Sequence, residues 1–202
     1  SENMYLDGLK IMEYMHNAAN DENKSAYVDT ITMIYLQRLE NFPVKKGVNQ
    51  KGNLYGRLGV DLMQMAPERC EEAYNYLKES VALEQDDASV SSLVYYFRAT
   101  IKKVKKGLAE ETLVVDTYDE LSTLIDANID KNANKPKKLA QWENARGNVE
   151  STFEPYATCD ALIGIYDKKY QESPEDLDLL KKITKILKKK KCTGSDLFFN
   201  AT

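Results

Sequence analysis

The stretch Tyr55-Gly-Arg-Leu-Gly-Val-Asp-Leu62 decides the fold of this chain. Its large apolar side chains recur at helical spacing, and the dipeptide Leu58-Gly59 lies between them. Eleven residues after Leu62, Ala73-Tyr-Asn-Tyr-Leu-Lys-Glu-Ser80 opens a second helical pattern with a small residue. Because glycine has no side chain, it lets a neighbouring helix approach closely. The two stretches therefore predict a helix-turn-helix unit that packs tightly at Gly59.

Helical periodicity extends outward from this unit over the whole chain, and no strand-like alternation rises above it. Prolines, glycines and capping residues divide the pattern into nine helices, and Phe42–Gly52 is the first clear linker. The predicted helix pairs span residues 3–41, 51–83, 88–131, 136–155 and 158–191, and residues 195–202 begin a further helix. We therefore predict a single all-α domain over residues 1–202, built as an α-solenoid of antiparallel helix pairs. An irregular helical bundle is the competing architecture.

Several segments resemble one family of helical repeats. They are Tyr27–Tyr35, Gly56–Leu62, Phe153–Cys159 and Pro174–Ile183, and Tyr55–Ser80 matches the repeat pattern best. On these segments the chain resembles a bacterial tetratricopeptide repeat (TPR) protein with long, degenerate units. The resemblance implies a TPR-like superhelix, a protein-binding role and no catalytic activity. The unfinished helical pattern at the C-terminus leads us to expect a fragment of a longer array.

The resemblance also implies where a partner would bind, because the first helix of each TPR pair lines a concave groove. With Gly59 at its expected position, the groove residues are Asn53, Val60, Met63, Gln64, Tyr95, Arg98 and Lys102. Aromatic, soft and polar side chains together suit the capture of a peptide. The resemblance therefore favours a non-enzymatic scaffold that holds a protein or peptide segment. The alternative is a small-ligand or carbohydrate-binding protein of the cell envelope, which would use exposed tyrosines.

Composition and motifs weigh against other classes of function. The chain has a formal net charge of −4, whereas general nucleic-acid binding requires basic surface that displaces counterions. No apolar run approaches the ~18 residues of a membrane span. His16 is the single histidine, and with three separated cysteines it supplies neither a zinc site nor a catalytic triad. We therefore expect no enzyme, no metal and no cofactor, and the oligomeric state stays open.

Two C-terminal features each have two interpretations. Lysines crowd residues 181–191, either as a solvated helix face or as a patch for an acidic partner or an anionic membrane. Cys159 and Cys192 stand at ends of the last two helices that an antiparallel pair brings side by side. They either form a disulfide or fill small sites as thiols. A disulfide would indicate an extracytoplasmic compartment, the periplasm or cell envelope, which we favour over the cytoplasm.

Overall fold

The computed structural model describes residues 1–202 and is all-α apart from one short β-hairpin, which confirms the predicted fold class. Ten α-helices follow one another along the chain, with short 3-10 segments at three of the connections. The α-helices are α1 (Glu2–Ala18), α2 (Asp21–Asn41), α3 (Lys51–Met65), α4 (Cys70–Glu84), α5 (Val90–Lys105), α6 (Thr112–Lys131), α7 (Pro136–Phe153), α8 (Cys159–Glu172), α9 (Leu177–Lys189) and α10 (Asp196–Asn200). The 3-10 segments are η1 (Pro67–Arg69), η2 (Gln85–Asp87) and η3 (Glu154–Tyr156).

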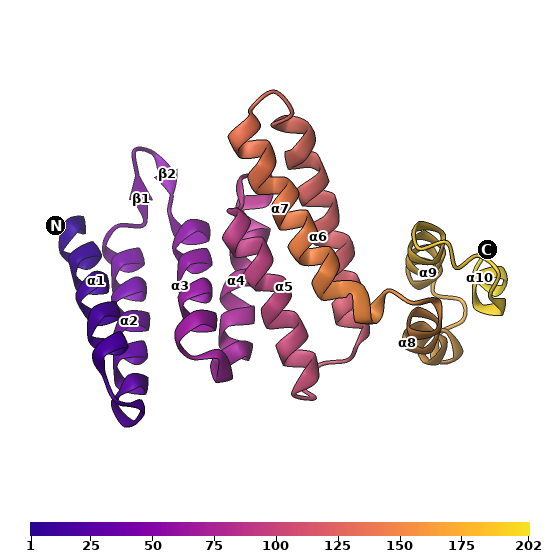
Figure 1. The fold of residues 1–202 in the computed structure, drawn as a ribbon, viewed down its shortest axis with the longest axis horizontal. Coiled ribbons are helices and arrows are strands. Elements are labelled where there is room, and N and C mark those ends of the chain that lie inside the picture. Colours follow the sequence, from indigo (N-terminus) through magenta and orange to yellow (C-terminus); the bar gives the residue numbers. More distant parts are fainter.

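The helices stand beside one another in chain order, so the molecule is elongated and its termini lie at opposite ends (Figure 1). Consecutive helices pack together from α1 to α7, and α5 also contacts both α3 and α7. The alternate helices α3, α5 and α7 therefore form a row of their own. Beyond α7 the direction changes, because α8 and α9 are seen nearly end-on where α3, α4 and α5 stand upright (Figure 1).

One hydrophobic core runs the length of this arrangement. It begins at Leu9 in α1, continues through every later α-helix and ends at Ala201. Its most completely buried large side chains include Tyr96, Phe97 and Phe153, which lie near the middle of the chain. The row of helices is therefore held together by continuous apolar burial, the main favourable term in folding. None of the helices is both long enough and apolar enough to cross a membrane.

The close approach predicted at Gly59 is present between α3 and α4. A Cβ atom at Gly59 would meet the side chain of Leu77, with its Cδ2 at 2.9 Å, and the backbone oxygen of Ala73 at 3.1 Å. One turn earlier, Gly56 lies against Ser80 of α4 and Ser92 of α5. These two glycines explain why three helix backbones can come together around the centre of α3.

Local capping chemistry sets the starts of several helices. The side chains of Ser89, Thr158 and Ser195 accept hydrogen bonds from backbone N–H groups in the first turns of α5, α8 and α10. Helix α9 begins at Leu177, although Ser173-Pro-Glu-Asp176 reads as a helix start, with a capping serine, a proline and first-turn acids. Its first turn is capped by Asp176, whose carboxylate accepts bonds from two backbone N–H groups. A carboxylate in that position also interacts favourably with the helix dipole.

The expected linker Phe42–Gly52 contains structure that periodicity did not reveal. Two-residue strands, β1 (Val44–Lys45) and β2 (Val48–Asn49), pair antiparallel across a turn at Lys46-Gly47. Both turn residues have positive φ, 50° and 79°, as a tight two-residue hairpin requires. Two-residue strands are too short to show alternation of apolar and polar residues. The only sequence indication of this hairpin was the Lys-Gly pair between two valines.

Candidate functional site

The row of alternate helices brings together residues that the sequence analysis assigned to a partner groove. On α3, spacings of seven and then four residues place Asn53, Val60 and Gln64 on one face of the helix. On α5, spacings of three and then four residues likewise place Tyr95, Arg98 and Lys102 on one face. With Asn148 of α7, which the sequence analysis missed, these residues define what we call the α3–α5–α7 face.

Side-chain contacts link the three helices across this face. Gln64 Nε2 donates a hydrogen bond of 2.9 Å to the Tyr95 hydroxyl, and the Arg98 guanidinium lies 5.1 Å from the centre of the Tyr95 ring. Arg98 also donates a 3.3 Å bond to Asn148 Oδ1. Gln64, Arg98 and Asn148 are exposed and Tyr95 is half-buried. The face therefore carries a continuous chain of polar and aromatic groups open to solvent.

The remaining predicted residues have different surroundings. Asn53 is exposed and makes no side-chain hydrogen bond, while Val60 is half-buried against the core. Met63 follows Val60 by three residues, beside the same face of α3, and is also half-buried against the core. Lys102 is half-buried, and its amino group has no partner within the chain. The structure thus brings Gln64, Tyr95 and Arg98 into mutual contact and leaves the other four outside that chain of contacts.

Helix α5 gives the face a positive charge. The segment Val90–Lys105 contains no acidic residue. Lys103 turns away from the face and pairs with Glu71 of α4 at 3.1 Å. Arg98 and Lys102, in contrast, form no ion pair within the chain. Two positive charges on the exposed side of α5 are therefore available to an anionic partner.

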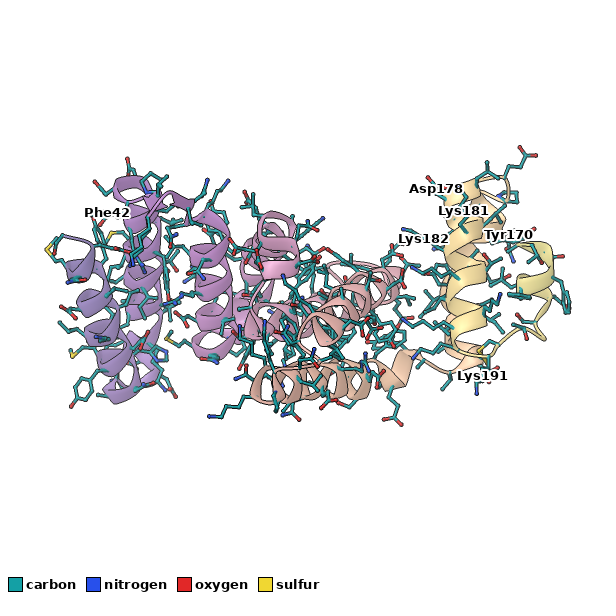
Figure 2. The ribbon with its side chains drawn as sticks, turned by 90° about the horizontal axis from the view of Figure 1, so that it is seen from above. Phe42, Tyr170, Asp178, Lys181, Lys182 and Lys191 are labelled. Carbon is teal, nitrogen blue, oxygen red and sulfur yellow. A yellow bond between two sulfur atoms is a disulfide. The ribbon has the colours of Figure 1, made fainter.

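The lysines of α9 are largely engaged with α6. Lys182 pairs with Asp116 at 3.2 Å and Lys185 pairs with Asp119 at 2.6 Å. Lys190 lies 3.1 Å from the hydroxyl of Tyr118 and 4.7 Å from the centre of its ring. Figure 2 shows Lys182 on the side of α9 that faces the rest of the molecule. These contacts favour a structural role for the lysine run over a patch free for an anionic surface.

The two C-terminal cysteines meet as the antiparallel arrangement predicts. Cys159 at the start of α8 and Cys192 after α9 form a disulfide, with their Cα atoms 5.4 Å apart. The third cysteine, Cys70, is buried and free. The disulfide ties the end of α9 to the segment that directly follows α7 and η3. It therefore closes the α8–α9 hairpin next to the rest of the helical row.

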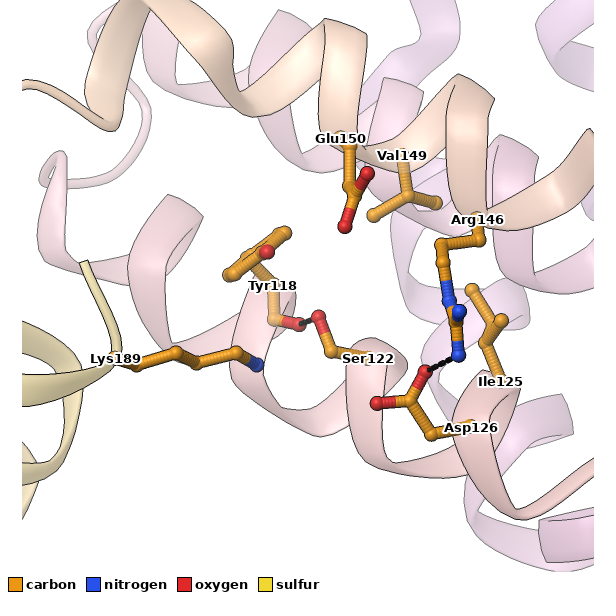
Figure 3. Close-up of a pocket in the computed structure, with 8 residues that line it drawn as sticks. All are labelled: Tyr118, Ser122, Ile125, Asp126, Arg146, Val149, Glu150 and Lys189. Carbon is orange, nitrogen blue, oxygen red and sulfur yellow. Dashed lines mark hydrogen bonds and ion pairs between the residues drawn. The ribbon is translucent and has the colours of Figure 1, made fainter. Parts of the chain in front are cut away.

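A hollow of about 250 Å³ lies where α6, α7 and the end of α9 meet (Figure 3). Its lining residues are Tyr118, Ser122, Ile125, Asp126, Arg146, Val149, Glu150 and Lys189. Arg146 and Asp126 form an ion pair, whereas Lys189 and Glu150 form none. The lining joins the consecutive helices α6 and α7 to the end of α9, so periodicity within any one helix could not reveal it.

A buried pair of titratable groups lies between α2 and α3. The Tyr35 hydroxyl donates a 2.6 Å hydrogen bond to Asp61 Oδ2. Burial raises the pKa of the Asp61 carboxyl to about 6, and the nearby charge of Glu13 acts in the same direction. The Tyr35 hydrogen bond and the positive charge of Arg57 oppose this rise in the Asp61 pKa. The pair joins two helices and lines none of the main hollows, so we treat it as structural.

His16 and the acidic side chains form no cluster of metal ligands. His16 is buried at the end of α1, and its Nδ1 lies 3.4 Å from the side-chain oxygen of Asn17. No group of three or more histidine, cysteine, aspartate or glutamate side chains is placed to hold a metal ion. Two regions gather side chains that a ligand could contact: the α3–α5–α7 face and the hollow of Figure 3, which is one of several hollows of similar volume.

Comparisons with models of protein families, with curated proteins and with solved structures find no match to this chain.

Proposed function

We propose that this protein is a non-enzymatic scaffold that binds an acidic protein segment on the α3–α5–α7 face. The observation that carries the proposal is the exposed chain of contacts from Gln64 through Tyr95 and Arg98 to Asn148. It crosses three helices without interruption. An extended peptide laid across these helices would meet aromatic, amide and cationic groups in succession, a combination suited to peptide recognition.

The packing of alternate helices supports a TPR-like array as the framework. Contacts of α5 with both α3 and α7 resemble the stacking of first helices in successive repeat units. Gly59 and Gly56 supply the close packing that such units require. In this proposal α3, α5 and α7 line the concave groove, and α4 and α6 form the outer layer. The turned α8–α9 hairpin would end the regular part of the array.

The charge of α5 supports an acidic occupant. Arg98 and Lys102 have no carboxylate partner within the chain, so an incoming aspartate or glutamate could pair with either. A basic segment would be repelled by the same two groups. Because the groups are exposed, the attraction would act mainly on the association rate and would weaken with salt.

The disulfide supports an oxidising, extracytoplasmic compartment for this scaffold. Structural disulfides persist in the periplasm and at cell surfaces and are rare in the cytosol. In this proposal the Cys159–Cys192 bond secures the C-terminal hairpin of a protein that acts in the cell envelope.

Selection of peptides from a random displayed library tests the proposal. We expect the selected peptides to be rich in aspartate and glutamate and to bind the chain in a fluorescence anisotropy assay. Tyr95→Ala with Arg98→Glu should weaken that binding at least tenfold in a variant that thermal denaturation shows to be still folded at the assay temperature. The variant removes the ring that Gln64 and Arg98 contact and reverses one of the free positive charges.

A matched control variant carries the same types of change elsewhere. Tyr14 is 72% exposed on α1, and Lys188 is exposed on α9. Tyr14→Ala with Lys188→Glu alters net charge and aromatic content as the test variant does, and should leave peptide affinity unchanged. Equal binding of the peptides to the test variant and to the native chain would refute the assignment of this face.

A further inference from the structure

We propose that the hollow between α6, α7 and α9 is a second binding site, specific for a small zwitterion of the size of a free α-amino acid. The site is separate from the α3–α5–α7 face and does not depend on the scaffold proposal. Three buried apolar or aromatic side chains and five polar or charged ones line it, so a ligand there would be held chiefly by polar contacts.

The charges of the rim decide the class of ligand. Among the charged residues that line the hollow, Arg146 is paired with Asp126, and Lys189 and Glu150 are in no ion pair. Lys190 lies outside the lining, and its ammonium donates to the Tyr118 hydroxyl. Figure 3 shows the Lys189 and Glu150 side chains directed toward the centre of the hollow. A simple anion would be repelled by Glu150, and a simple cation would be repelled by Lys189. A ligand with one ammonium and one carboxylate group can pair with both.

The remaining lining groups suit the uncharged part of such a ligand. Tyr118, Ile125 and Val149 are nearly fully buried and form the apolar base of the hollow. The Ser122 hydroxyl donates its hydrogen to the backbone oxygen of Tyr118, so its lone pairs remain free to accept a bond. A ligand ammonium placed near Glu150 could therefore find a second acceptor at Ser122.

The volume of the hollow limits the ligand to a small molecule. At about 250 Å³ it is smaller than the roughly 300–1,000 Å³ of most sites for drug-sized ligands. A free amino acid is a ligand of correspondingly small size. A peptide of several residues would not fit within the hollow.

Contacts made by Lys189 and by the residues that follow it hold the end of α9 at the rim. The Lys189 amino group lies 5.1 Å from the centre of the Tyr118 ring. The next residue, Lys190, lies 3.1 Å from the Tyr118 hydroxyl, and Cys192 is bonded to Cys159. These contacts hold the end of α9 against α6, and the contact with the Tyr118 ring keeps the Lys189 ammonium at the rim of the hollow.

Titration calorimetry on the complete oxidised chain tests the proposal. Free L-amino acids are titrated singly, and the tightest binder is compared with its amide, which lacks the carboxylate, and its N-acetyl form, which lacks the ammonium. Both blocked forms should bind at least tenfold more weakly. Lys189→Met should weaken binding of the free amino acid and leave binding of the amide unchanged. Glu150→Gln should weaken the free amino acid and spare the N-acetyl form.

Lys188→Met is the matched control, because Lys188 is an exposed neighbour that does not line the hollow. It should bind the free amino acid as the native chain does. Two results would overturn the proposal. One is equal affinity for the free and both blocked forms; the other is no saturable heat from any free amino acid up to about 10 mM, beyond the millimolar limit of weak specific binding.

Discussion

At the scale of single residues, Gly59 allows α3 and α4 to pack closely because it has no side chain. Gly59 lies so close to Leu77 and to the backbone of Ala73 that an added methyl group has no room. An alanine would otherwise favour a helix interior by up to about 1 kcal/mol. At this position the steric cost should exceed that gain, because a backbone atom cannot move aside as the end of a long side chain can.

Gly59→Ala should therefore lower the free energy of unfolding by about 1–3 kcal/mol, the usual cost of overpacking a core. Urea denaturation followed by circular dichroism measures the change. Gly147→Ala is the control, since Gly147 lies within α7 and a Cβ atom there would meet nothing within 4 Å. The control should raise stability by about 0.5–1 kcal/mol. A Gly59→Ala variant as stable as its control would contradict the close-packing account.

Asp61 makes a second residue-level prediction, which concerns pH. Its carboxyl has a pKa of about 6 in the folded chain, chiefly because it is buried, against 3.8 for an unperturbed aspartate. Between these values the folded state holds a proton that the unfolded state has released. The contribution of Asp61 to stability is therefore fully present below pH 3.8 and is lost as the pH rises through 6.

Asp61→Asn removes this ionisation and keeps an oxygen that can accept the Tyr35 hydrogen bond. The difference in unfolding free energy, variant minus native, should rise between pH 4.5 and pH 7.5 by up to about 2 kcal/mol. Burial also raises the pKa of Glu120, so the stability of the native chain alone would reflect both groups. Subtracting the native value from the variant value isolates the contribution of Asp61. A difference that stays constant over this range would show that Asp61 does not titrate as described.

At the scale of elements, the C-terminal hairpin is joined to the rest by charge and by a covalent bond. Lys182 and Lys185 of α9 pair with Asp116 and Asp119 of α6, four partly exposed groups whose pairs contribute modestly. The disulfide encloses a loop of 33 residues, for which chain-entropy arguments give about 3–4 kcal/mol. The covalent bond should therefore be the larger of the two contributions.

Removal of the disulfide tests that ranking. Cys159→Ser with Cys192→Ser should lower the unfolding free energy by about 3–4 kcal/mol. Reductant should destabilise the native chain and have no effect on this variant. Intact mass should show the native protein lighter by two hydrogens before reduction. An unchanged mass on reduction would mean that the bond does not form and would remove the support for an extracytoplasmic compartment.

At the scale of the whole molecule, the sequence predicted those features that depend on residues close together along the chain. Helix periodicity, the packing at Gly59 and the antiparallel approach of Cys159 and Cys192 all follow from local spacing. The α9 lysines show the limit of that reasoning. Their partners on α6 lie 66 residues earlier, and only the folded arrangement decides which lysines are paired.

The candidate sites also include residues that local spacing predicted and residues that only the folded arrangement reveals. Helical spacing and the repeat resemblance identified Gln64, Tyr95 and Arg98, which the structure brings into contact. Asn148 completes that chain from α7, where Arg146-Gly147 stands in place of the Leu-Gly step that aligned α3. The hollow of Figure 3 was missed entirely, because it depends on how the C-terminal hairpin turns against α6 and α7.

The charge preference of the α3–α5–α7 face is the most direct test of the central claim. The measurement is the affinity, at fixed low salt, of one selected acidic peptide and of its lysine-substituted counterpart for the native chain and for Arg98→Glu. The account predicts that the acidic peptide loses at least tenfold in affinity on Arg98→Glu and that the lysine counterpart prefers that variant. Affinities that do not change with the charge at Arg98 would contradict the account.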